Sequence, residues 1–223
     1  MTFDDLYEEG MSLDVEAFWG AGFLAGRYVE AHPSWTWSEV VRPLIRDARC
    51  ALDMGTGDGG MLAGLAPLPP LIVAYEEWLP TVDTAVATLR PLGVHVVVAL
   101  GSDDNTTVER TRPGLPFAHE AFEIVLNRHE AFDAIEVRRI ARPGGTFVTQ
   151  QVGSDEAASV RVLLGLETNE PAWDASVSAA QLVDAGWIVN DVREERPSVR
   201  FTDIAALIGY VRSTPWAFED VTL

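Results

Sequence analysis

The chain has 223 residues, 48% hydrophobic and 22% charged, a balance typical of a globular protein long enough to bury a core. Its formal net charge is −18, and phosphate backbones are normally bound by basic surfaces, so we expect no nucleic acid as a partner. No apolar run approaches the roughly 20 residues that span a bilayer, and residues 1–10 are acidic, unlike a signal peptide. We therefore expect a cytoplasmic protein that does not contact membranes.

Several chemistries are excluded by missing residue types. Every basic residue is an arginine, so a lysine Schiff base and the lysine of a P-loop are both excluded. The single cysteine, Cys50, excludes an internal disulfide and a cysteine-based zinc cluster. The histidines show no ligand spacing, so we predict no metal site. We interpret the dense basic group of Arg138, Arg139 and Arg142 as a solvated helix face.

From Cys50 onward, strand-like apolar runs alternate with helical patterns, which predicts an α/β fold with a mostly parallel sheet. The predicted strands are Cys50–Met54, Leu71–Tyr75, Val94–Leu100, Phe122–Leu126, Thr146–Gln151 and a segment near Trp187–Val192. The predicted helices are Met61–Ala66, Thr81–Arg90, Ala134–Ala141 (ended by Pro143-Gly144-Gly145), Ser178–Ala185 and Asp203–Val211. We expect residues 1–49 to form an N-terminal helical lid or cap over the open end of the sheet, and residues 50–223 to form the main domain.

A glycine-rich turn directly follows the first predicted strand. Glycines allow both a left-handed backbone and the close approach of a ligand, and ligands bind at strand ends in open parallel sheets. Gly55, Gly57 and Gly60 also fit the GxGxxG pattern of dinucleotide enzymes, which is weak evidence alone. Asp53, two residues before Gly55, disfavours a pyrophosphate and suits a cationic ligand such as the sulfonium and amino group of S-adenosylmethionine (SAM).

At this point the chain resembles the class I SAM-dependent methyltransferases, in register from about Cys50 to Gly153. The first motif of that family, [LV]-[DE]-x-G-x-G-x-G, is matched by Leu52, Asp53, Gly55, Gly57 and Gly59. The resemblance implies a Rossmann-like fold with a mostly parallel seven-stranded sheet and helices on both faces. It also implies SAM as the cofactor, bound by Asp53, Gly55, Thr56, Gly57, Gly59, Glu76, Asp103, Asp104 and Asn127.

Three acidic residues of that set lie at or just after the ends of strands. The family ends its second strand in an acid that binds both ribose hydroxyls, which here implies Glu76, with the adjacent Glu77 ranked second. After its third strand the family places an acid and the residue that follows it near the adenine, which implies Asp103 and Asp104. An Asp/Asn-rich turn explains those two residues equally well.

Two later blocks extend the resemblance in the same order. Leu115-Pro116-Phe117, followed by the strand from Ala121 to Leu126, is similar to the "LPF…FDxV" block, with Glu123 in place of aspartate. Arg142–Phe147 is similar to the "LxPGGxF" block that enters the fifth strand.

The likeness is closest to a group of small, mostly uncharacterised actinobacterial methyltransferases. It is carried by Asn127–Glu130 after strand four, Thr149–Gly153 on strand five, and a tail like Arg200–Asp203 followed by Pro215-Trp216. The resemblance implies methylation of a small-molecule acceptor at oxygen or nitrogen, with secondary metabolism as one setting, by a monomer or homodimer.

Methyl transfer from SAM is a direct displacement, so alignment of nucleophile, carbon and sulfur supplies most of the catalysis. A nucleophile that must lose a proton also needs a base. We predict His129 as that base, because histidine titrates near ~6.5, with Glu130 orienting it or acting itself. A purely structural role for His129 stays open.

Three alternatives remain. A nicotinamide-dependent oxidoreductase would use Gly55, Gly57 and Gly60. A SAM-binding protein that does not methylate would act as a sensor or partner subunit. An RNA or nucleobase methyltransferase is disfavoured by the charge and by the absence of prolines after strand four.

Overall fold

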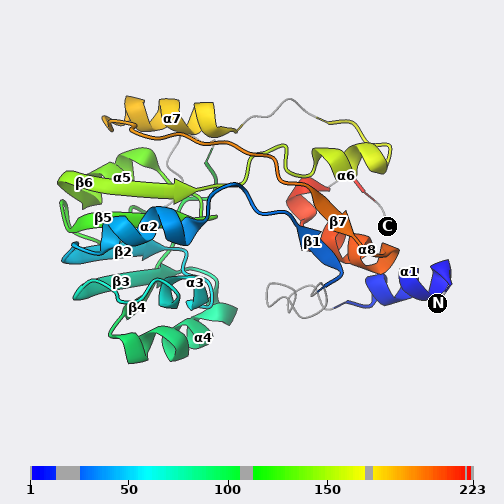
Figure 1. The fold of residues 1–223 in the computed structure, drawn as a ribbon, viewed down its shortest axis with the longest axis horizontal. Helices are drawn as coiled ribbons and strands as arrows, with labels where there is room; N and C mark the ends of the chain where they lie inside the picture. The colour runs from blue at the N-terminus through cyan, green and yellow to red at the C-terminus, as the bar shows by residue number, and fades with distance from the viewer. Residues whose placement is uncertain (1, 14–25, 106–112, 169–172, 219, 222–223) are drawn as a thin grey trace. The chain divides into compact units, whose positions relative to one another are not determined.

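The computed structural model describes residues 2–13, 26–105, 113–168, 173–218 and 220–221 (Figure 1). The helices are α1 (Phe3–Met11), α2 (Trp37–Ile45), α3 (Gly60–Ala63), α4 (Leu79–Leu89), α5 (Ala134–Ile140), α6 (Ala158–Leu163), α7 (Ala175–Asp184) and α8 (Ile204–Ser213), with 3-10 turns η2 (Arg90–Leu92) and η3 (Pro215–Ala217). The strands are β1 (Tyr28–Glu30), β2 (Cys50–Met54), β3 (Leu71–Glu76), β4 (His95–Val98), β5 (Phe122–Arg128), β6 (Ala141–Gln150) and β7 (Val199–Phe201).

The chain divides into two compact units. The first unit comprises residues 1–34, 156–169 and 195–223, and the second comprises residues 35–155 and 170–194. The first unit thus joins both ends of the chain to one internal segment. The lid function of residues 1–49 stays a prediction, and residues 14–25 of that segment lie outside the described residues. No described helix is both long enough and apolar enough to cross a membrane.

The second unit is built on a five-stranded parallel sheet in the order β4-β3-β2-β5-β6. The central strand β2 is almost wholly buried, because parallel strands are covered on both faces and therefore consist of continuous apolar runs. In register, Met54 lies opposite both Tyr75 of β3 and Asn127 of β5. The carboxyl ends of three neighbouring strands therefore meet at one edge of the sheet.

The expectation of a seven-stranded sheet is wrong, since the described part of this sheet has five strands. The segment 187–192, predicted as a strand, is irregular, and its apolar residues Ile188 and Val192 are 84% and 52% exposed. Of this run, Trp187 packs against the core, whereas Ile188 and Val192 face outward. A further strand, β7, forms instead at Val199–Phe201, in the small sheet of the first unit.

The Pro143-Gly144-Gly145 run also differs from its prediction. Helix α5 ends at Ile140, and the run lies inside β6 rather than at the end of the helix. A Cβ built on Gly145 would lie 3.0 Å from the Glu123 carbonyl oxygen of β5, beside a shift in the β5–β6 register. The small residue permits the two strands to approach where this pairing is irregular.

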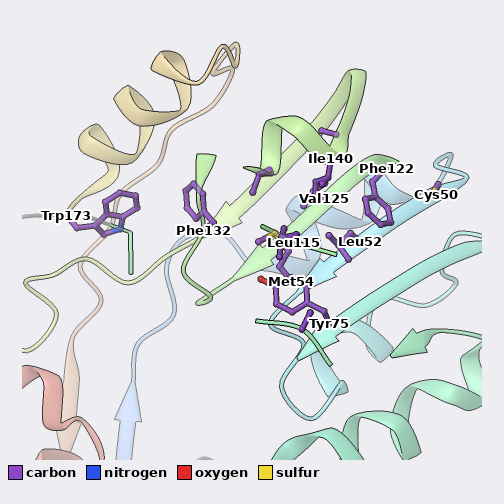
Figure 2. Packing of buried hydrophobic residues seen from close by; sticks show 13 residues of the cluster. Cys50, Leu52, Met54, Tyr75, Leu115, Phe122, Val125, Phe132, Ile140 and Trp173 are labelled. Atoms are coloured by element: carbon purple, nitrogen blue, oxygen red, sulfur yellow. The ribbon is translucent and has the colours of Figure 1, made fainter. Parts of the chain in front are cut away.

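Each face of the parallel sheet carries its own hydrophobic core. One core combines β2, β3 and β5 with α5 and α7; Figure 2 shows Tyr75 beside Met54 within it, and Phe132 near Trp173. The other core packs α2, α3 and α4 on the opposite face, through Trp37, Leu62 and Leu89. Helices therefore cover both faces, and the strand ends remain available to polar side chains.

The first unit contains a two-stranded antiparallel sheet of β1 and β7, with α1 packed against α8. The helices approach closely because a Cβ on Gly10 would lie 2.8 Å from Ile208 Cβ. Arg27 donates hydrogen bonds of 2.8 Å to Glu9 and to Asp203, which caps α8, so one guanidinium links α1 to α8. These hydrogen bonds connect the two helices of the first unit through polar side chains.

Candidate functional site

The turn after β2 has the backbone that its glycines were expected to allow. Gly55, Gly57 and Gly59 have φ angles of 60°, 61° and 80°, in the left-handed region, whereas Gly60 does not. A Cβ on Gly59 would lie 2.6 Å from Leu89 Cγ of α4, and around Gly57 nothing lies within 4 Å. The spacing that the backbone requires is thus G-x-G-x-G, the methyltransferase form, and the open position at Gly57 leaves room for a ligand.

Asp53 lies at the end of β2, next to this turn. Desolvation raises the pKa of its carboxyl group to about 7, the nearby Thr56 side chain acts in the opposite direction, and the charge of Glu76 raises this pKa further. Within the described residues no ion pair reaches either Asp53 or Glu76. A cation placed near these two carboxylates would relieve their repulsion.

Glu76 ends β3 and binds the glycine turn directly. Its Oε2 accepts a hydrogen bond of 2.6 Å from Gly57 N, and its Oε1 accepts one of 2.7 Å from Trp78 N. The residue is buried. The adjacent Glu77 points elsewhere, because its Oε2 accepts a hydrogen bond of 2.9 Å from Gly101 N after β4. Of the two acids, Glu76 is therefore the one that contacts the glycine turn.

Glu130 reaches the same edge from the segment after β5. A Cβ on Gly55 would lie 2.6 Å from its Oε2, and a Cβ on Gly101 would lie 2.6 Å from its Oε1. The carboxylate therefore lies between the residues that follow β2 and β4. This placement suits a ligand contact at the glycine turn as well as the predicted catalytic role.

Tyr75 is a residue of this site that the sequence analysis missed. Its side chain is fully buried, and its hydroxyl has no hydrogen-bond partner in the structure. A Cβ on Gly101 would lie 2.9 Å from that hydroxyl, so the group lies close to the Glu130 carboxylate. A polar aromatic residue one position before the strand-terminal acid was the available signal.

Asn127 lies within β5, opposite Met54 of β2. The side chain is fully buried, and its Oδ1 accepts hydrogen bonds from Thr149 Oγ1 at 3.2 Å and Gln151 Nε2 at 2.6 Å. Gln151 Nε2 also lies 2.9 Å from the Glu130 carbonyl oxygen, which accepts from it. Asn127 and Gln151 thus fix the segment that carries Glu130, and Asn127 as a cofactor ligand stays a prediction.

Asp103 and Asp104 line a cavity of about 420 Å³ whose wall also includes Met54, Tyr75 and Phe132. The neighbouring Asn105 holds this wall together: its Oδ1 accepts a hydrogen bond of 2.9 Å from Phe132 N, and its carbonyl accepts one of 3.1 Å from Gln181. Residues 106–112, part of the turn-rich stretch expected here, lie outside the described residues. The structure therefore places both aspartates at a cavity, without a contact that assigns them to adenine.

His129 adopts a left-handed backbone, with φ of 63°, and its N–H donates a hydrogen bond of 2.8 Å to the Gln150 carbonyl. Its side chain is exposed. Partial desolvation of the ring, and then the charge of Arg128, lower the pKa of the imidazole to about 4. The ring is therefore neutral near pH 7 and able to accept a proton, and its unusual backbone is of the kind found at functional sites.

The basic group of Arg138 and Arg139 on α5 and Arg142 on β6 is not the solvated helix face that we expected. Arg139 is tied down by Glu136, by Phe117 O at 2.8 Å and by Leu115 O at 2.9 Å. Arg142 pairs with Glu123 at 2.8 Å, and Arg138 lies over the Trp187 ring. All three arginines are therefore held by contacts with other residues of the protein. Among the described residues, no three acidic, histidine or cysteine side chains gather as a metal site would require.

No protein-family model matches the chain, and no curated protein matches it significantly. Solved structures do match. A putative methyltransferase from Bacillus halodurans is 21% identical, with a TM-score of 0.50, over 70% of each chain. A SAM-dependent methyltransferase from Aquifex aeolicus is 20% identical, with a TM-score of 0.46, over 66% of this chain and 77% of that one.

The YcgJ protein from Bacillus subtilis is 18% identical, with a TM-score of 0.39, over 50% of this chain and 48% of that one, so the match spans about half of each protein. At these identities the likeness concerns the fold. Together with the strand order and the glycine turn, the match to the Bacillus halodurans structure shows an α/β Rossmann-like fold like that of this putative methyltransferase, with five strands in the described part of the central parallel sheet.

Proposed function

We propose that the protein transfers a methyl group from SAM to a small-molecule acceptor, at oxygen or nitrogen. The observation that carries this proposal is the hydrogen bond from Gly57 N to Glu76 Oε2, which joins the left-handed glycine turn after β2 to the acid that ends β3. Gly57 of the first motif and Glu76 at the end of β3 are thus brought together at the carboxyl edge of the parallel sheet, which is where such sheets bind ligands.

The residues present fit a cationic cofactor. Asp53 and Glu76 have no described cationic partner, the pKa of Asp53 is raised to about 7, and the buried hydroxyl of Tyr75 has no partner. We assign the cofactor site to Asp53, Thr56, Glu76 and the turn glycines, with Asp103, Asp104 and Asn127 as further ligands. Bound there, SAM supplies a methyl group activated by its sulfonium.

The same geometry disfavours the dinucleotide alternative. A pyrophosphate needs free backbone N–H groups at the start of a helix, but Gly57 N already donates to a carboxylate and α3 has only one turn. Asp53 and Glu76 would also repel the phosphates. The nicotinamide oxidoreductase is therefore the weaker reading of this turn.

The protein residues contribute position and proton transfer. Gln151 and Asn127 fix the segment after β5, which presents His129 and Glu130 near the sheet edge. We propose that His129, neutral near pH 7, takes the proton from the acceptor, and that Glu130 orients it or replaces it in this role. A lid function for the N-terminal residues would exclude water.

Three further features belong to the same proposal: a setting in secondary metabolism, the cytoplasm as location, and a monomer or homodimer as the active form. The segment Asn127–Glu130 and the tail Arg200–Asp203 support kinship with the small actinobacterial methyltransferases.

The test combines binding and transfer. Thermal unfolding should shift upward with SAM and not with NAD, because binding to the native state stabilises it. Incubation with SAM carrying an isotopically labelled methyl group and a panel of phenols, amines and carboxylates should then yield a labelled product. A shift with NAD alone would overturn the proposal. Binding of SAM without transfer to any acceptor would favour the non-catalytic sensor.

A further inference from the structure

One side chain covers two glycines at the carboxyl edge of the parallel sheet. A Cβ built on Gly55, after β2, would lie 2.6 Å from Glu130 Oε2, and a Cβ built on Gly101, after β4, would lie 2.6 Å from Glu130 Oε1. Glycine allows another group to come close to the backbone. At both positions that group is the Glu130 carboxylate, whereas around Gly57 nothing lies within 4 Å.

The carboxylate fills space that the proposed cofactor site needs. A Cβ is only about 1.5 Å from its Cα, so both carboxylate oxygens lie at van der Waals distance from the glycines themselves. The residues assigned to the cofactor lie on both sides of it, with the turn at Gly55 after β2 and Asp103 after β4. A ligand that contacts both sides therefore cannot bind while Glu130 keeps this position.

Glu130 can leave this position by rotation of its side chain alone. Its carbonyl oxygen accepts a hydrogen bond of 2.9 Å from Gln151 Nε2, and the preceding His129 N donates one of 2.8 Å to Gln150 O. These bonds fix the main chain against the residues at the end of β6. The side chain is half-buried, and side chains that reach solvent change rotamer within picoseconds to nanoseconds. One backbone can thus carry the carboxylate in two positions.

We propose that Glu130 is an autoinhibitory side chain: in the closed position, where it covers Gly55 and Gly101, it blocks the cofactor, which binds after the carboxylate rotates away. The inference rests on the proposed function and adds a form of regulation to its cofactor site. It depends on the volume that the side chain fills rather than on its charge. Rotated outward, the carboxylate becomes available for the role beside His129, so cofactor binding also prepares the catalytic segment.

The closed position lowers the apparent affinity for the cofactor. When only a fraction of the molecules can bind, the apparent dissociation constant is the intrinsic one divided by that fraction. A protein that is open in about one molecule in ten binds about tenfold more weakly than one that is always open. A variant without the carboxylate should therefore bind the cofactor more tightly, whereas loss of a direct ligand contact would weaken binding.

The experiment compares the dissociation constants of SAM for the wild-type full chain and for Glu130→Ala by calorimetry. Alanine keeps the Cβ and removes the carboxylate, so SAM has no side chain to displace. Glu130→Ala should bind SAM about three- to tenfold more tightly, which corresponds to a wild-type protein that is closed in about two thirds to nine tenths of the molecules.

Two variants serve as controls. Glu130→Gln keeps the length of the side chain and loses its charge, so it should show little of this gain. Asp83→Asn removes one charge from an exposed position on α4 and should match the wild type. A gain in Glu130→Gln as large as that in Glu130→Ala would assign the effect to charge and would overturn the inference.

A structure of the wild-type protein with SAM gives a second readout. The Glu130 carboxylate should then lie away from both Gly55 and Gly101, on an unchanged main chain. A carboxylate that still touches both glycines beside bound SAM would show that this contact does not oppose the cofactor, and the inference would be wrong.

The outcomes separate this inference from the one on which it rests. If neither the wild-type protein nor Glu130→Ala binds SAM, the proposed function fails and this inference with it. If the wild type binds SAM and Glu130→Ala binds it equally or less tightly, only the autoinhibitory role is overturned. Should Glu130→Ala fail to fold, the structure with SAM decides.

Discussion

The side chain of Glu130 lies directly against Gly55, so that a Cβ on Gly55 would come within 2.6 Å of Glu130 Oε2 and 2.7 Å of Glu130 Cβ. Gly57 has the same left-handed backbone, yet nothing lies within 4 Å of its own Cβ position. A side chain at either position would therefore be strained by the left-handed backbone. Only at Gly55 would it also clash with a neighbouring residue.

Gly55→Ala should consequently be more harmful than Gly57→Ala. Both substitutions carry the strain of roughly 1–2 kcal/mol for a left-handed residue, and Gly55→Ala adds an overpacking cost of about 1–3 kcal/mol. Urea unfolding of the two variants measures the difference directly. Equal losses of unfolding free energy would show that Glu130 moves away from Gly55 at no cost.

The raised pKa of Asp53 predicts a pH dependence of SAM binding. A carboxyl group with pKa of about 7 is half protonated at neutral pH, and a cationic ligand favours its ionised form. Affinity should therefore rise with pH, by about tenfold per unit below pH 7, and level off above pH 8. Calorimetry from pH 6 to 8.5 checks this.

In Asp53→Asn the slope should vanish, because the titrating group is gone. The protein without ligand should behave oppositely: a raised carboxyl pKa makes its contribution to stability fall as pH rises from about 4 to 7. A wild-type affinity independent of pH would remove Asp53 from the binding site.

Asp203 predicts an acid-sensitive first unit. The hydrogen bonds from Arg27 lower the pKa of Asp203 to about 2, so ionisation of this group stabilises the folded chain above pH 4. The contribution, about 2 kcal/mol, should be lost as pH falls from 4 toward 2. Urea unfolding at pH 5, 4 and 3 should show a shallower decline in Asp203→Asn than in wild type.

Glu8→Gln is the matched control for that series, since Glu8 is exposed on α1 of the same unit. It should keep the wild-type decline. The interpretation of the Arg27 bridge would be wrong if Asp203→Asn followed the wild-type curve, or if both variants became equally shallow.

His129 tests the proposed base. Asparagine tolerates the left-handed backbone of this position better than most residues, so His129→Asn removes the imidazole with little change in melting temperature. We expect kcat to fall by about 10²-fold or more. The wild-type rate should show no break near pH 6.5, because the pKa of the ring lies at about 4. Full turnover in His129→Asn would leave alignment alone as the mechanism.

The sequence was most informative where short-range rules act. The buried strand Cys50–Met54 was predicted with its observed bounds, because a continuous apolar run between turn signals has few alternatives. Glu76, one position beyond the predicted end of its strand, was singled out through the order of the motifs, and its side chain contacts the glycine turn. In both cases neighbouring residues determine the structure.

The rest depends on contacts between distant segments. β1 pairs with β7 across most of the chain, so no local pattern could reveal the small sheet or the first unit. The apolar run near Ile188 looks like a strand, but Ile188 and Val192 are exposed in the structure. The contact of Glu130 with Gly55 and the buried hydroxyl of Tyr75 likewise arise only once three strand ends are brought together.

The most direct measurement is the dissociation constant of SAM for the wild-type protein, for Glu76→Gln and for Asp83→Asn. Glu76 holds the glycine turn through Gly57 N, whereas Asp83 is an exposed acid on α4. The account predicts wild-type affinity for Asp83→Asn and a loss of about tenfold or more for Glu76→Gln in a folded variant. Equal affinity in all three proteins, or no binding of SAM by the wild type, would contradict it.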